Sequence, residues 1–165
     1  MIEVCLFRHG PAFASGTAGT TEEDRPLTPE GRRKTLRAAR GLKRLDLGLD
    51  GVVTSPLARA VETAEILAEV LGLAPPRVDE RLLPGALPLA FVELLRGMDA
   101  LRPVFAGHQP HLSAALRLLL GAPEGDAFKF TKAGMALVRL RTMSPAPRGT
   151  LRLLLPASVL RRIGR

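Results

Sequence analysis

Apolar residues gather in short runs along this chain, and longer segments between the runs carry apolar positions three and four residues apart. Three runs have the composition of buried parallel strands: residues 2–7, 51–55 and 103–107. Three longer segments have the spacing of amphipathic helices: residues 29–45, 56–71 and 111–120. Thr28 and Pro29 suit the start of the first helix. This alternation of strands and helices predicts an α/β fold with a mostly parallel sheet.

The remaining segments are less regular. Residues 11–27 are dense in Gly, Ala, Thr and Ser and predict a loop long enough to cover a site. Two partly alternating runs predict paired strands around a Pro- and Gly-rich turn: residues 135–141 and 150–155 around 144–149. Three shorter segments predict a strand leading into a loop, a helix, and a final helical turn or two: residues 77–82, 89–96 and 157–165. We find no internal repeat and no polar linker, so we expect one domain, residues 1–165.

Composition narrows the classes of partner. The formal net charge of +8 permits binding to nucleic acid, acidic membrane surfaces or phosphorylated substrates. Trp and Tyr are absent and aromatic residues make up only 4%, which disfavours stacking on nucleic-acid bases. No apolar stretch has the length of a membrane span and the N-terminus has no basic leader, so we expect a soluble cytoplasmic protein without membrane or nucleic-acid partners. Three histidines without a cysteine or carboxylate cluster at ligand spacing predict no metal site.

Cationic or nucleophilic side chains follow three of the predicted strands directly. Arg8 and His9 follow the first strand, Ser55 and Arg59 follow the second, and His108 follows the strand 103–107. Because the carboxyl ends of parallel strands lie at one edge of a sheet, we expect these side chains to converge there. Two histidines and two arginines at such an edge, with helix N-termini nearby, favour an anion site that suits a phosphoryl group.

Four segments in this order carry a family resemblance: Arg8-His9-Gly10, Asp24 to Gly31, Ser55 to Ala64, and Gly107 to Ser113. They resemble the motifs of the histidine phosphatase superfamily, and in particular its phosphoglycerate mutase-like group. The match covers nearly the whole chain, which lacks room for the long insertions of the phosphoglycerate mutases and looks most like the short phosphohistidine phosphatases of bacteria. The resemblance implies a three-layer sandwich, with helices on both faces of the sheet, and metal-free chemistry without a cofactor.

The resemblance also implies a role for each motif residue. His9 is expected to attack phosphorus and carry a transient phosphohistidine. Arg8 and Arg59 are expected to clamp the non-bridging oxygens, and His108 to donate to the same oxygens. Ser55 has two readings of equal weight, a phosphate ligand or a cap for the helix that follows it.

The resemblance also implies a proton donor for the leaving group, which the family usually draws from the region after its third strand. We expect Glu80 to supply it. Asp79 is the rival, because neighbouring side chains of an extended segment point to opposite faces and only one can enter the site. The alternative for Glu80 is a solvated loop carboxylate. Glu62 is interpreted as a helix residue bonded within its motif rather than as an acid. Two residues beside the site, Gln109 and His111, depart from the Asn and Gly often found in short relatives.

The predicted function is a metal-independent phosphatase with a phosphohistidine enzyme intermediate, for which phosphohistidine in a protein is one expected substrate. The first alternative is a phosphomonoesterase for a small phosphorylated metabolite, whose second charge would be read by basic residues such as Arg25, Lys129 and Lys132. The second alternative, from a different class, is a non-catalytic module that binds phosphate. The sequence leaves open the physiological substrate, the oligomeric state and whether the loop 11–27 closes over the site.

Overall fold

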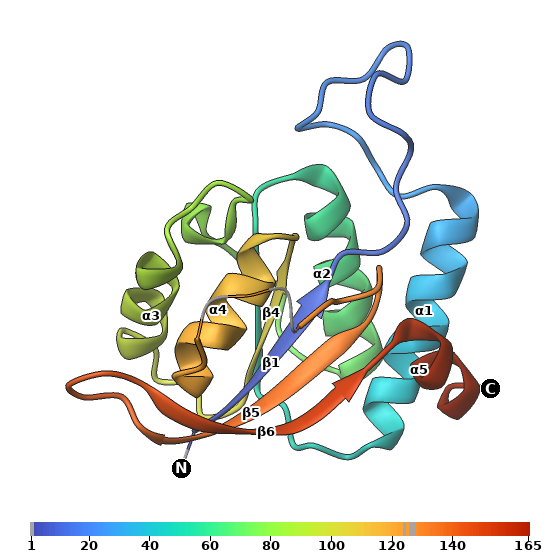
Figure 1. Cartoon of the computed structure of the whole chain (residues 1–165). Helices are drawn as coiled ribbons and strands as arrows, with labels where there is room; N and C mark the ends of the chain where they lie inside the picture. Colours follow the sequence, from blue (N-terminus) through green and yellow to red (C-terminus); the bar gives the residue numbers. More distant parts are fainter. Residues whose placement is uncertain (1, 124, 126–127) are drawn as a thin grey trace.

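The strands of this protein form a single mixed sheet at the centre of the molecule (Figure 1). The computed structural model describes residues 2–123, 125 and 128–165. Within these residues the order of the strands is β3-β2-β4-β1-β5-β6. Their bounds are β1 Ile2–Arg8, β2 Gly51–Thr54, β3 Arg77–Val78, β4 Pro103–Gly107, β5 Met135–Thr142 and β6 Arg148–Leu155. Strands β1 to β4 are parallel to one another, β5 is antiparallel to β1, and β6 is antiparallel to β5, which confirms the mostly parallel sheet.

Helices cover both faces of the sheet, which confirms the three-layer sandwich. Their bounds are α1 Pro29–Arg44, α2 Ala58–Leu71, α3 Pro88–Arg96, α4 His111–Leu120 and α5 Ala157–Ile163. Alternate residues of β1 face the two layers. Cys5 and Phe7 belong to the apolar core that includes residues of α1, α2 and α5, whereas Val4 and Leu6 belong to the core with residues of α3 and α4. A strand buried on both faces needs the near-continuous apolar run seen in the sequence.

The residues at the ends of three helices explain where those helices begin or end. The Thr28 hydroxyl accepts a hydrogen bond of 2.9 Å from the Gly31 amide, and Pro29 occupies the first turn, as the sequence predicts. Helices α2 and α4 end at Gly72 and Gly121, whose φ angles of 74° and 64° lie in the left-handed region that glycine adopts without strain.

Three predicted boundaries are wrong. The short strand predicted within residues 77–82 is present as β3, but it ends at Val78, and a 3-10 helix, η1 (Glu80–Leu82), capped by the Asp79 side chain, follows in place of the predicted loop. Helix α2 begins at Ala58 rather than Pro56, because Leu57 remains extended. The predicted turn 144–149 is shorter, because Arg148 and Gly149 pair with β5.

The described part of the chain contains no helix that is both long enough and apolar enough to cross a membrane.

Candidate active site

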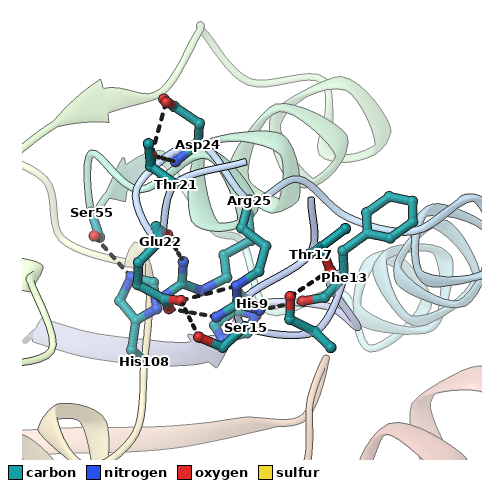
Figure 2. Close-up of polar contacts among 12 residues, drawn as sticks. His9, Phe13, Ser15, Thr17, Thr21, Glu22, Asp24, Arg25, Ser55 and His108 are labelled. Atoms are coloured by element: carbon teal, nitrogen blue, oxygen red, sulfur yellow. Dashed lines mark hydrogen bonds and ion pairs between the residues drawn. The ribbon is translucent and has the colours of Figure 1, made fainter. Parts of the chain in front are cut away.

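The carboxyl ends of β1, β4 and β2 meet at one edge of the sheet, as the sequence predicts. Arg8 pairs with Gly107 in the parallel register, and the His9 amide continues this ladder by donating a bond of 2.9 Å to the Gly107 carbonyl. His9 and His108 therefore lie side by side, with ring centroids 5.0 Å apart and ring planes inclined by 50° (Figure 2). Ser55, which follows β2, lies on the other side of His108.

Gly10 allows the backbone after β1 to pack tightly against the helical layer. Its amide donates a bond of 3.0 Å to the Thr63 hydroxyl on α2. A Cβ atom at this position would lie 2.0 Å from the Thr35 hydroxyl oxygen on α1, a distance that no side chain tolerates. The third residue of the Arg-His-Gly motif is therefore fixed by packing, and this packing holds the preceding histidine in place.

The hydrogen bond of His9 determines which of its nitrogens is available for chemistry. Nδ1 lies 2.7 Å from the Gly10 carbonyl oxygen, which only accepts hydrogen bonds. Nδ1 therefore carries the proton, and Nε2 keeps its lone pair. Only 6% of the surface of His9 is exposed, so this tautomer and orientation are held inside the protein.

Both histidines of the pair are held neutral. Burial, with smaller contributions from Arg59, Arg8 and Lys132, lowers the pKa of His9 to about 3 despite the bond to the Gly10 carbonyl. Burial also lowers the pKa of His108 to about 3, with help from the neighbouring His9 and Arg59. Neutral imidazole is the nucleophilic form, so the site keeps His9 ready to attack an electrophile at neutral pH.

Two arginines border the histidine pair from different elements. Arg59, in the first turn of α2, is buried, and its Nη1 donates a bond of 2.8 Å to the Glu22 carbonyl. Nη1 of Arg8 donates a bond of 2.7 Å to the Phe130 carbonyl. In each guanidinium Nε is buried without a hydrogen-bond partner among the described residues. A buried donor without a partner is costly, so these groups suit an anion that enters the site.

Ser55 connects the second motif to the second histidine. Its hydroxyl lies 2.8 Å from Nε2 of His108 and also accepts a longer bond of 3.4 Å from the Leu57 amide. Ser55 therefore orients His108 and also bonds the residue that caps α2. Nδ1 of His108 is buried without a partner among the described residues, so it is the ring nitrogen left for a ligand.

A carboxylate that the sequence analysis missed already occupies the arginine side of the site. Glu22, from the loop 11–27, contacts Arg59 at 3.1 Å and Arg25 at 2.5 Å, and it accepts a bond of 3.1 Å from Ser15 (Figure 2). These contacts, led by the hydrogen bonds from Arg25, lower the pKa of Glu22 to about 2. Its Oε1 therefore stands where an anionic ligand would meet the same arginine. No motif marks this residue, since only the course of the loop brings it to the site.

The two acidic candidates after β3 differ in what they contact. Asp79 accepts bonds of 2.8 and 2.7 Å from the Arg81 guanidinium and caps η1, and the side-chain bonds from Arg81 lower its pKa. Both carboxylate oxygens of Asp79 are thus bonded to Arg81. Glu80 is exposed and borders the same surface groove as Glu22. The extended geometry assumed for this pair is wrong, because Glu80 begins a 3-10 helix.

Other sequence candidates take supporting positions. Glu62 accepts a bond of 3.0 Å from the Leu27 amide and forms an ion pair of 2.9 Å with Arg32, so it anchors the end of the loop 11–27. His111 is buried at the start of α4, with its ring 6.3 Å from that of Phe91 and both ring nitrogens unpartnered among the described residues. Gln109 accepts a bond of 2.8 Å from the Ser113 hydroxyl.

The described residues contain no group of three or more His, Cys, Asp or Glu side chains placed to hold a metal ion.

Comparison with known proteins agrees with this geometry. The family model described as the histidine phosphatase superfamily (branch 1) matches residues 4–83. An uncharacterised protein of the cyanobacterium Picosynechococcus is 37% identical over 142 residues, which cover 84% of this chain and 85% of the relative. The chain belongs to the histidine phosphatase superfamily. Membership accounts for the order of the four motifs and for their convergence at one edge of the sheet.

Solved structures share the whole fold. The protein histidine phosphatase SixA, solved with tungstate, superposes with a TM-score of 0.84 at 23% identity, covering 96% of this chain and 99% of that one. A mycobacterial glucosyl-3-phosphoglycerate phosphatase superposes with a TM-score of 0.75 at 20% identity, covering 94% and 99%. Members with differently named substrates therefore share this architecture.

Because three histidines are buried, we expect the folded protein to become less stable as the pH decreases. Burial lowers the pKa of His9 and His108 from the ordinary 6.5 to about 3 and also lowers the pKa of His111, so below about pH 6.5 the unfolded chain binds more protons than the native one. The free energy of unfolding should therefore decrease as pH falls, by up to about 1.4 kcal/mol per pH unit for each histidine. Melting temperatures at pH 7, 6 and 5 test this, because ordinary carboxylates titrate below that range. His111→Leu should reduce the slope, and a flat profile would contradict the predicted burial of neutral imidazoles.

The contact between Glu22 and Arg59 predicts competition with phosphate. Glu22→Gln removes the negative charge but keeps the size of the side chain, so orthophosphate should bind about threefold to tenfold more tightly in the variant at low salt. Calorimetric titration with orthophosphate measures this change. Glu69→Gln, on the opposite end of α2, is the matched control for loss of one negative charge. Equal affinity in Glu22→Gln and the parent would show that the carboxylate does not compete for the arginines.

Proposed function

We propose that this member of the superfamily is a metal-independent phosphatase that transfers phosphoryl to His9 and then to water, and that its substrate is phosphohistidine in a protein. The observation that carries the proposal is the neutral, buried His9, whose Nε2 is free while Nδ1 is held by the Gly10 carbonyl. Arg8, Arg59 and His108 surround it with donors for the phosphoryl oxygens. No cofactor takes part in the proposed reaction.

In the first step the phosphoryl group displaces Glu22 from Arg59 and enters between the two arginines. Nε2 of His9 attacks phosphorus, forming the N–P bond, while the bond from phosphorus to the leaving group breaks. Arg8 and Arg59 neutralise the non-bridging oxygens, and bidentate guanidinium geometry fixes their orientation. His108, oriented by the Ser55 hydroxyl, supplies a further hydrogen bond from Nδ1 in the tautomer that carries a proton there.

In the second step water attacks the phosphohistidine, giving orthophosphate and the neutral imidazole again. The same donors stabilise the oxygens in both steps, because the phosphoryl group moves only between its two axial partners. The Gly10 carbonyl keeps its bond to Nδ1–H throughout. It therefore stabilises the positive charge that develops on the ring when Nε2 forms its bond to phosphorus.

Glu80 is our proposed proton donor for leaving groups that need one. It lines the same groove as Glu22, whereas the carboxylate of Asp79 is held by Arg81. Glu80→Gln should slow hydrolysis of a poorly activated ester such as phenyl phosphate about 10²-fold and leave p-nitrophenyl phosphate within a few-fold of the parent. Initial rates on the two esters measure this difference. Asp79→Asn is the comparison variant, and equal slowing on both esters would remove Glu80 from this role.

A protein substrate is supported by the likeness of this fold, over nearly its whole length, to that of a protein histidine phosphatase. A cytoplasmic location, where phosphorylated signalling proteins occur, is part of the same proposal.

A small phosphorylated metabolite with a second anionic group is the second candidate, and one cavity favours it. This cavity of about 350 Å³ adjoins Arg8 and is also lined by Arg117 and Lys129. Its two additional cations would read a carboxylate or second phosphate on the substrate. Arg25, a further basic candidate, is already bonded to Glu22 and to the Phe13 carbonyl.

Rates on two substrates test the proposal in the presence of EDTA. We expect phosphate release from a phosphohistidine-containing protein to exceed that from p-nitrophenyl phosphate, with EDTA having no effect. Fast turnover of a small ester with no action on phosphohistidine would instead support the metabolite phosphatase. Loss of activity in EDTA that returns with added divalent metal would contradict the metal-independent mechanism. Binding of orthophosphate without turnover of either substrate would support the non-catalytic module.

A further inference from the structure

An open groove continues outward from the candidate active site on the side of Glu22. It has a volume of about 610 Å³, and its apolar wall is formed by Leu57, Leu83, Pro84 and Ala86 with the first turn of α3. Glu22 belongs both to this groove and to the contact with Arg59. A molecule whose phosphoryl group lies between the arginines therefore has the groove directly beside it.

The groove is bordered by an unusually apolar surface segment. Residues 83–90 read Leu-Pro-Gly-Ala-Leu-Pro-Leu-Ala, eight consecutive positions without a polar side chain. Leu87 and Leu89 in this segment are 74% and 57% exposed, although a folded chain gains by burying such side chains. Exposed apolar residues that cluster beside a site are typical of a surface that binds a partner.

The groove is also lined by acidic residues, although the chain as a whole is strongly basic. Glu23 and Glu80 line it, and neither has an ion-pair partner among the residues that the structure describes. The positive charge of Arg81 is balanced by the two bonds to Asp79. The groove thus offers carboxylates to a basic group, next to a wall that offers aliphatic contacts.

We propose that this groove binds the polypeptide that flanks the phosphorylated histidine of the substrate, and that this flank is aliphatic with one lysine or arginine. The inference rests on the proposed function, and it adds the chemistry by which a substrate protein is selected. A phosphoryl group alone needs only the arginines and histidines. The groove falls within the range of about 300–1,000 Å³ that encloses much larger ligands, so a small ester would leave most of the apolar wall uncovered.

Three synthetic peptides, each phosphorylated on one histidine, test the selection. The first has leucines and a lysine beside the histidine, the second serines and a lysine, and the third leucines and a glutamate. We expect kcat/KM to be about tenfold higher for the first peptide than for the second, from burial of one to two leucine side chains, and severalfold higher than for the third.

Two surface substitutions test whether the groove causes the preference among the three peptides. Ala86→Gln places a polar side chain on the apolar wall and should remove the preference for leucine. Glu23→Lys should shift the preference from the lysine peptide to the glutamate peptide. Leu101→Gln, an exposed apolar position outside the groove, is the matched control, and all three variants should hydrolyse p-nitrophenyl phosphate like the parent.

The outcomes separate this inference from the proposed function. Equal hydrolysis of all three peptides would overturn the groove and leave the phosphohistidine phosphatase intact. If no peptide is hydrolysed while p-nitrophenyl phosphate is, the proposed substrate class fails, and fluorescence anisotropy of the same peptides with His9→Ala then tests the groove alone. Binding that does not depend on the flank would overturn it. A third outcome is that the enzyme prefers 1-naphthyl phosphate over p-nitrophenyl phosphate, that Ala86→Gln removes this preference, and that the three peptides are hydrolysed equally. This result would overturn the polypeptide ligand and assign the groove to a small lipophilic ester.

Discussion

Replacing His9 with alanine should reduce phosphate release by at least about 10⁴-fold on any substrate, because the variant lacks the atom that accepts the phosphoryl group. The arginines and His108 remain, so the variant should still bind orthophosphate. Labelling with a radioactive substrate and rapid acid-free denaturation should trap phosphoenzyme in the parent and none in His9→Ala. Together these results would separate the nucleophile from the binding groups that surround it.

Chemical rescue makes this experiment specific. His9 fills a buried position, so its truncation leaves a space beside the arginines that free imidazole fits. Added imidazole should restore part of the activity of His9→Ala, because its nitrogen replaces Nε2. His111→Leu is the control for loss of a buried histidine, and it should keep activity within a few-fold of the parent. Residual activity of one tenth or more in His9→Ala without imidazole would exclude the covalent mechanism.

Arg59→Lys should lower kcat/KM about 10²-fold although the charge is conserved. Lysine has one ammonium group, whereas the buried guanidinium of Arg59 bonds the Glu22 carbonyl and the Glu22 carboxylate with different nitrogens and still has Nε unpartnered. Two phosphoryl oxygens cannot be held in a fixed orientation by one point charge. Steady-state rates on p-nitrophenyl phosphate and on a phosphohistidine protein measure the loss.

The control for this substitution is Arg40→Lys on the exposed face of α1, which should behave like the parent. Melting temperatures show whether the buried lysine also destabilises the fold. A decrease in kcat/KM of less than threefold in a stably folded Arg59→Lys variant would contradict a bidentate role for this guanidinium.

The sequence predicted those parts of the site that depend on strand ends. His9 and His108 follow adjacent parallel strands, so their proximity is a consequence of topology and needs no knowledge of side-chain packing. Ser55 and Arg59 were predicted for the same reason, because Ser55 follows β2 directly and Arg59 lies in the first turn of the next helix, α2. Their catalytic roles stay predictions that the substitutions above test.

The parts that the sequence did not predict depend on contacts between distant segments. Glu22 comes from an irregular loop, whose path is set by the bonds that Glu62 makes near its end and by the contacts of Arg25. The 3-10 helix after β3 forms because Asp79 caps it and Leu82 is completely buried beneath it. The spacing of apolar residues along the sequence predicts neither the contacts of this loop nor the cap of this 3-10 helix, since each depends on a few individual side chains.

The Glu22 carboxylate makes every binding event at this site an exchange of one anion for another. Orthophosphate that the reaction leaves behind must compete with a tethered carboxylate, whose local concentration does not change when the solution is diluted. Product release is therefore assisted from within the chain. The same carboxylate competes with the substrate, so faster release of orthophosphate is accompanied by weaker binding of the substrate.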